Sequence, residues 1–164
     1  MASEILRPAD GERDLETVRE LFREYQRSLG IDLCFQGFEA ELAGLPGDYA
    51  PPRGQLWLAE RGEGEALGCV AMRELDPQRA EMKRLYVRPA ARGLGLGRRL
   101  AETLIAEARR HGYRAVCLDT LPAMATAQAL YEELGFADIA PYRVNPVPGA
   151  RYMGLELAPS AGGG

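Results

Sequence analysis

The segment LYVRPAARGLGLGRRL, residues 85–100, decides the fold because it passes from a strand to a helix through a turn rich in glycine. Its three glycines alternate with other residues, and the turn opens directly into an amphipathic helix. Glycine lets the backbone approach an anion closely, and the start of a helix offers unpaired N–H groups and the positive end of its dipole. Arg92 and Arg98 add positive charge at the same place. The segment therefore predicts a site for a pyrophosphate group.

The spacing of these glycines excludes two common nucleotide-binding loops. A P-loop requires Gly-Lys-Ser/Thr at the start of its helix, whereas Gly97 is followed by Arg98-Arg99. A Rossmann loop has Gly-x-Gly-x-x-Gly after the first strand of a βαβ unit, whereas this Gly-x-Gly-x-Gly follows an antiparallel series of strands. The alternative is a loop that uses glycine only to turn, but three alternating glycines flanked by arginines exceed what a turn requires.

The segments on both sides of the glycine turn indicate a mixed α/β domain. Apolar patterns bounded by glycine and proline predict strands over residues 5–8, 55–60, 66–75, 80–87, 115–118, 136–139 and 152–157. The same reasoning predicts helices over residues 12–28, 38–45, 97–111 and 123–134. No internal repeat is present. We therefore expect one α/β (α+β) domain over residues 1–158 and a disordered tail over 159–164.

The composition excludes several classes of protein. The chain has 164 residues, of which 46% are hydrophobic and 27% are charged, as in ordinary globular domains. No apolar run reaches the roughly 18 residues of a membrane span, and the first residues lack a secretory signal, so we expect a cytoplasmic protein with no membrane partner. The net charge of −4 argues against a nucleic-acid partner. Three separated cysteines and a single histidine, His111, predict neither a disulfide framework nor a metal site.

Two segments resemble motifs of the GCN5-related N-acetyltransferase (GNAT) superfamily. The pattern Arg92-x-x-Gly95-x-Gly97 resembles its coenzyme A signature, and ALYEELGF over residues 129–136 resembles its Leu-Tyr-x-x-x-Gly-Phe motif. The two occur in the family's order, with a helix and a strand between them. The resemblance implies a mixed, mostly antiparallel twisted sheet of about seven strands with helices on both faces. It also implies that the sheet splits near Val87, where acetyl-CoA would enter.

The resemblance assigns the binding of coenzyme A mainly to backbone groups. It implies that Arg92 and the N–H groups of the turn hold the pyrophosphate; the turn consists of Gly93, Leu94, Gly95, Leu96, Gly97 and Arg98. The strand edge at Leu85, Tyr86 and Val87 would bind the pantetheine arm, and an N–H near Leu85 would polarise the thioester carbonyl as an oxyanion hole. One departure is Met124, which replaces a common asparagine of the family, so one coenzyme contact is expected to be missing or supplied by backbone or by Thr126.

Glu81 is the candidate general base. It lies eleven residues before Arg92, which is the spacing of the catalytic glutamate in histone-acetylating members of the family. A carboxylate there would accept the proton of the amine directly or through a water. The alternative is an exposed strand residue that pairs with Lys83 or Arg84, because strand alternation alone does not say which face Glu81 occupies.

Tyr131 is the candidate general acid. The resemblance places it where the family's tyrosine protonates the sulfur of coenzyme A. A phenol with a pKa near 10 suits a thiolate leaving group of similar basicity. The alternative is a helix tyrosine that packs beside Leu130 and Leu134.

The acceptor pocket of this family lies between the N-terminal helices and the loop before the last strand. Those regions offer four candidate substrate contacts: Tyr25, Phe35, Tyr142 and Asn145. Arg143 is a further candidate for binding a substrate carboxylate, although an isolated arginine is more often a surface residue.

We therefore expect an N-acetyltransferase that passes the acetyl group of acetyl-CoA directly to a primary amine of a small molecule or a protein. Transfer is expected within a ternary complex, because no cysteine occupies an obvious nucleophile position. The partners would be acetyl-CoA and the amine acceptor, with no metal, and dimerisation is common in the family. The alternatives are a transferase that uses a different acyl-CoA and a non-catalytic acyl-CoA-binding sensor.

Overall fold

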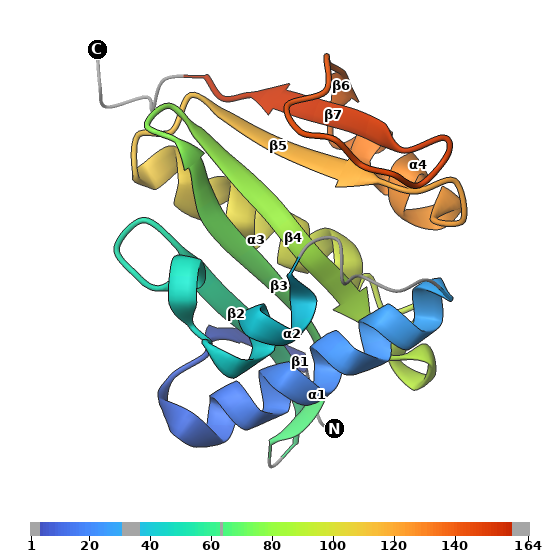
Figure 1. Ribbon diagram of the computed structural model, residues 1–164. Helices are drawn as coiled ribbons and strands as arrows, with labels where there is room; N and C mark the ends of the chain where they lie inside the picture. The colour runs from blue at the N-terminus through green and yellow to red at the C-terminus, as the bar shows by residue number, and fades with distance from the viewer. Residues whose placement is uncertain (1–3, 31–36, 63, 159–164) are drawn as a thin grey trace.

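The computed structural model describes residues 4–30, 37–62 and 64–158, and these ranges form one seven-stranded sheet with helices on both faces (Figure 1). The strand order is β1-β2-β3-β4-β5-β7-β6. All paired strands in these ranges are antiparallel except β4 and β5, which run parallel. The predicted fold class is therefore confirmed. The tail predicted over 159–164 lies outside the described residues.

The strands and helices follow the predicted order. The strands are β1 (Glu4–Pro8), β2 (Gln55–Arg61), β3 (Glu65–Asp76), β4 (Arg79–Val87), β5 (Ala115–Thr120), β6 (Ala137–Asp138) and β7 (Arg151–Glu156). The helices are α1 (Gly11–Leu29), α2 (Phe38–Ala43), α3 (Leu96–Arg110) and α4 (Ala125–Glu133), with short 3₁₀ turns η2 (Gly47–Tyr49) and η3 (Pro89–Ala91). None of the helices in the described ranges is long and apolar enough to cross a membrane.

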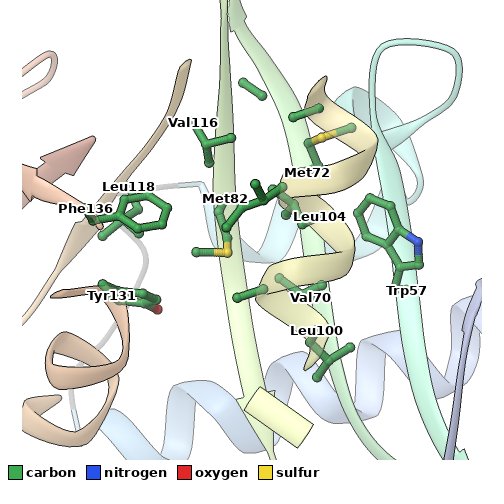
Figure 2. Close-up of a cluster of buried hydrophobic side chains, with 14 of the residues drawn as sticks. Trp57, Val70, Met72, Met82, Leu100, Leu104, Val116, Leu118, Tyr131 and Phe136 are labelled. Carbon is green, nitrogen blue, oxygen red and sulfur yellow. The ribbon is translucent and has the colours of Figure 1, made fainter. Parts of the chain in front are cut away.

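Two hydrophobic cores hold the helices to the sheet. Helix α3 packs on one face, because Leu100 and Leu104 lie one turn apart and are both fully buried. Figure 2 shows these leucines among side chains of β3 and β4, including Met72 and Met82. Helices α1 and α2 pack on the opposite face, through side chains such as Phe22. Full burial of a side chain of this size contributes about 1.5–3 kcal/mol, so the two cores fix both faces of the central strands.

A bulge in β4 and an early divergence from β5 distort the centre of the sheet. Cys69 of β3 pairs with Tyr86 and Ala71 pairs with Lys83, so two steps along β3 face three along β4. The extra residue lies at Arg84, which is the only described non-glycine residue with a positive φ, at 59°. Such a bulge bends a strand and increases its local twist.

The pairing of β4 with β5 covers only Arg79–Glu81 of β4, opposite Ala115–Cys117 of β5. Beyond Glu81 the two strands diverge toward their C-terminal ends (Figure 1). The sequence placed the split near Val87, but the pairing stops several residues earlier because the bulge at Arg84 turns β4 away. The whole C-terminal half of β4 therefore presents one unpaired edge.

Candidate active site

A pocket opens in the gap between β4 and β5. The chain segments that line it come from both strands, from α1 and α4, and from the loop between β6 and β7. Its polar lining consists of Lys83 and Arg84 of β4, Asp119 of β5, Tyr25 of α1, Tyr131 of α4 and Asn145 of the loop. Leu85 also lines the pocket, beside the bulge. The structure thus brings four of the predicted site residues together: Tyr25, Leu85, Tyr131 and Asn145.

The glycine turn ends beside this gap and leaves an open helix N-terminus. Gly93 and Gly95 have φ angles of 90° and 75°, which side-chain-bearing residues rarely adopt. No atom lies within 4 Å of a Cβ built at either position. Gly95 is the N-cap of α3, and no side chain caps the helix. The first N–H groups of α3 therefore lack a capping side chain, and this donor set fits a diphosphate.

The two arginines of the turn are held differently. The Arg92 Nε donates to the carbonyl of Val87 at 3.2 Å, which ties the turn to the end of β4. The Arg98 guanidinium contacts Glu133 at 3.0 Å and Glu102 at 3.7 Å, and both carboxylates are more than half exposed. Exposed ion pairs of this kind contribute at most about 1 kcal/mol, so exchange of either one for a phosphate costs little.

The Tyr86 side chain is held against α1, which leaves the backbone edge of β4 from Leu85 to Val87 for binding in the gap. The Tyr86 hydroxyl donates to Glu24 of α1 at 3.3 Å, and its ring meets the Tyr25 ring edge-on with centroids 6.2 Å apart. Since β5 does not pair with these residues, their outward backbone groups are open to a ligand in the gap, except the Val87 carbonyl, which accepts from Arg92. An extended pantetheine-like chain with amide groups has the chemistry to pair with such an edge.

We expect Gly95→Ala to lower the free energy of unfolding by about 1–2 kcal/mol, because alanine at a left-handed φ is strained. Binding of coenzyme A should weaken as well, since relief of this strain would reshape the turn. The matched control is Gly97→Ala, whose Cβ would make only ordinary contacts, with Leu130 at 3.7 Å and Val87 at 4.0 Å. Urea denaturation and calorimetric titration with coenzyme A measure both effects. Equal losses in the two variants would contradict the role of the left-handed turn.

Glu81 lies at the closed end of the gap and is fully buried. Arg143 of the β6–β7 loop contacts both carboxylate oxygens, through Nη1 to Oε2 and through Nη2 to Oε1 at 2.8 Å. The Arg73 Nε donates to Oε1 at 2.8 Å, and the Tyr142 hydroxyl donates to Oε2 at 2.8 Å. The carboxylate is thus surrounded by donors from β3 and from the loop.

These donors control the ionisation of Glu81. Burial on its own would raise the pKa of this carboxyl, but the Arg143 hydrogen bond and the nearby charge of Lys83 outweigh burial and lower the pKa to about 2. A carboxylate with so low a pKa is a weak base, and its oxygens are already engaged. The general-base role of Glu81 stays a prediction, and the geometry favours a structural role in fixing the loop.

Tyr131 lies in the core beside Phe136, with ring centroids 5.7 Å apart (Figure 2). Burial raises the pKa of its phenol, and the neighbouring Tyr25 and Asp119 raise it further. Its hydroxyl makes no hydrogen bond with any of the described residues, although the side chain lines the pocket. Tyr131 is therefore a protonated phenol with a donor available in the gap, as a general acid requires.

The structure places two of the four predicted substrate contacts, Tyr25 and Asn145, in the pocket. Tyr25 lies in the pocket, and burial raises the pKa of its phenol to about 12. Asn145 also lines the pocket and donates to the Asp119 carboxylate at 3.2 Å. Tyr142 is not among the lining residues and instead donates to Glu81. Phe35 lies outside the described residues.

Comparison with known proteins identifies the family. The sequence model of the Acetyltransferase (GNAT) family matches residues 15–136. The chain belongs to the GNAT family. An uncharacterized N-acetyltransferase of Schizosaccharomyces pombe is 42% identical over 147 residues, which cover 89% of this chain and 90% of that protein. An IAA acetyltransferase of Azospirillum brasilense is 41% identical over 103 residues, which cover 62% of this chain and 67% of that protein.

A solved structure shows the same fold. A GNAT-family acetyltransferase of Staphylococcus aureus superimposes with a TM-score of 0.80 at 21% identity, over 95% of this chain and 100% of that chain. The family membership predicted from the two motifs is therefore confirmed, and the protein is an acyltransferase of the GNAT type. Its described residues contain no group of three or more histidine, cysteine, aspartate or glutamate side chains arranged for a metal ion.

This GNAT domain departs from the family pattern at Met124, and the structure gives that residue a local role. Its backbone accepts from the N–H of Gln128 at 2.9 Å in the first turn of α4. Its side chain lines the pocket, and its sulfur accepts from the Thr120 hydroxyl at 3.8 Å. A thioether makes the wall apolar where an asparagine would have offered an amide.

Sequence reasoning missed three charged residues of the pocket, Lys83, Arg84 and Asp119. Lys83 and Asp119 each lie two residues beyond the last β4–β5 pair, Glu81 with Cys117, so alternation puts their side chains on the same face of the sheet. That spacing would have found them only if the parallel register of β4 and β5 had been known. Arg143 was considered for a substrate carboxylate, but its guanidinium is bound to Glu81.

Proposed function

We propose that this protein transfers the acetyl group of acetyl-CoA to a primary amine bound in the pocket between β4 and β5. The observation that carries the proposal is the position of three features around one gap: the uncapped start of α3, the unpaired edge of β4 and the Tyr131 phenol. Acetyl-CoA supplies the acetyl group as a reactive thioester. The turn over residues 92–98 would hold its pyrophosphate, and the edge over 85–87 would align its pantetheine arm.

The two proton transfers are assigned to side chains of α4 and β5. Tyr131 would donate a proton to the departing thiolate; burial keeps its phenol protonated, but the raised pKa makes it a weaker acid than a free phenol. An amine must also lose a proton as it attacks. Among the described residues Asp119 is the carboxylate that lines the pocket; Asn145 donates to its Oδ2 at 3.2 Å and Arg143 lies 3.7 Å from its Oδ1. Its influence on the pKa of both Tyr25 and Tyr131 supports a central position among these groups. We therefore assign the acceptance of this proton to Asp119, while Glu81 remains the candidate that the family spacing indicates.

Direct transfer is supported by the state of the cysteines in the described ranges. Cys69 and Cys117 are buried, and burial raises the pKa of both thiols. A thiol held in its protonated form is a poor nucleophile. An acetyl-cysteine intermediate at either of these two described positions is therefore disfavoured, which favours direct attack by the amine.

The proposal is tested by thiol release from acetyl-CoA at pH 8 with a panel of primary amines, in parallel with calorimetric titration of coenzyme A. Release that depends on one class of amine, with the acetylated product identified by mass, would support it. Asp119→Asn should lower kcat/KM at least tenfold, because a positioned base contributes about 10²–10⁴-fold. Binding without release for any amine would favour the sensor, and release with a longer acyl-CoA only would favour a different donor. Failure to bind coenzyme A would contradict both the transferase and the sensor.

A further inference from the structure

Two apolar side chains, one from each strand, stand at the closed end of the gap between β4 and β5. The last pair of the two strands is Glu81 with Cys117, so Met82 and Leu118 are the first residues beyond it. Both line the pocket, although they are only 3% and 2% exposed. Anything that reaches this end of the gap therefore meets a methionine on β4 and a leucine on β5.

The acid assigned to Tyr131 fixes which part of the donor lies here. Figure 2 shows Met82 extending from β4 toward Leu118 of β5 and Tyr131 of α4, and all three belong to the core on the α3 face of the sheet. If Tyr131 protonates the departing thiolate, the sulfur of the donor lies beside its hydroxyl. The acyl carbon is bonded directly to that sulfur. The acyl group therefore lies within reach of Met82 and Leu118, which line the same pocket as Tyr131.

The direction of the donor along β4 leads to the same place. The turn assigned to the pyrophosphate, residues 92–98, follows β4, and the edge assigned to the pantetheine arm covers residues 85–87. The arm would therefore run back along β4, and its acyl end would reach the residues before Leu85. At Glu81 the strands are already paired, about 4.8 Å apart, and no chain passes between them. A longer acyl chain that continued along the gap would meet Met82 first.

The pocket has little room beyond what an acetyl group needs. Its volume is about 30 Å³, which holds one small group such as a water or a methyl group. Each further methylene needs volume that the buried side chains of Met82 and Leu118 already occupy. Protein cores are closely packed, so inserting a methylene forces neighbouring side chains or backbone to shift.

We propose that Met82, with Leu118 opposite it, sets the length of the acyl group and excludes acyl-CoA donors with chains longer than acetyl. This inference rests on the proposed function, for which it names the residues that determine donor specificity. One methylene more or less in an apolar pocket changes kcat/KM about 10- to 200-fold. Shortening either side chain would open the end of the gap without introducing a polar group.

The test measures kcat/KM with acetyl-, propionyl- and butyryl-CoA and the amine of the panel that gives the fastest thiol release. The wild-type protein should prefer acetyl- over propionyl-CoA by about 10- to 200-fold. Met82→Ala should lower this preference at least tenfold, and Leu118→Ala should lower it from the opposite strand. The matched control is Met72→Ala: Met72 pairs with Met82 across β3 and β4, is fully buried in the same core and is not among the residues that line the pocket. That variant should keep the wild-type preference.

The outcomes separate this inference from the proposed function. Equal use of the three donors by the wild-type protein would overturn it and leave the transferase intact. So would a preference that survives in folded Met82→Ala and Leu118→Ala proteins, or one that Met72→Ala loses equally; thermal unfolding shows which variants are folded. Calorimetric titration with acetyl- and butyryl-CoA gives a readout that needs no turnover: weaker binding of butyryl-CoA, restored in Met82→Ala, supports the inference, and equal affinities overturn it. Binding of no acyl-CoA at all would overturn the inference and the proposed function together.

Discussion

Tyr131→Phe is expected to lower kcat about 100- to 10,000-fold, the range for loss of a positioned general acid. The hydroxyl makes no hydrogen bond with the described residues, so its removal should cost the fold little. The ring would keep its contact with Phe136, and coenzyme A affinity should change less than threefold, because binding is assigned to the backbone of the turn. The loss would therefore lie in kcat and not in binding or stability.

Steady-state kinetics with the best amine acceptor measures the effect on kcat. Calorimetry with coenzyme A and thermal unfolding measure the effects on binding and on stability. The matched control is Tyr113→Phe, a buried tyrosine of the same core whose hydroxyl donates to the Arg53 carbonyl at 2.8 Å. That variant should lose about 1 kcal/mol of stability and keep its kcat. A Tyr131→Phe protein with wild-type kcat would exclude the phenol as the acid and leave only a packing role.

Local signals explain why much of the fold was predictable. The glycine turn, the helix that follows it and the α4 motif each depend on neighbours in sequence, and all three lie where they were predicted. The predicted ends of helices and strands were less exact where tertiary contacts decide them. Phe136 was assigned to a strand, but its N–H donates to the Tyr131 carbonyl at 2.9 Å and its ring is buried, so β6 begins only at Ala137.

The charged part of the site was less accessible to sequence reasoning for a physical reason. Glu81 obtains its partners from Arg73 on the neighbouring strand and from Tyr142 and Arg143, some sixty residues later in the chain. Lys83 and Asp119 come to line one pocket only through the parallel register of β4 with β5. Spacing along one strand says nothing about such contacts, so the alternative of an exposed ion pair for Glu81 was reasonable and the buried cluster was not foreseen.

Glu81→Ala is expected to lower the free energy of unfolding by about 3–5 kcal/mol, because it leaves the two arginines of a buried ion cluster without their shared carboxylate. Glu12→Ala is the matched control: its carboxylate pairs with Arg19 at 3.1 Å but is 73% exposed, and such pairs contribute under about 1 kcal/mol. Urea denaturation at pH 7 compares the two. A loss below 1 kcal/mol for Glu81→Ala would contradict the structural role.

The same cluster makes a prediction about acid stability, read from Glu81→Gln. The pKa of Glu81 falls from 4.5 to about 2 on folding, so its ionisation stabilises the folded state above pH 4.5 and this contribution fades as the pH falls toward 2. The contribution amounts to about 3 kcal/mol. The difference in unfolding free energy between wild type and Glu81→Gln should therefore shrink between pH 5 and pH 2. Parallel curves would contradict this contribution. A Glu81→Gln protein of wild-type stability that has lost turnover would instead support the general-base role, because a proton acceptor is required by the chemistry and not by the fold.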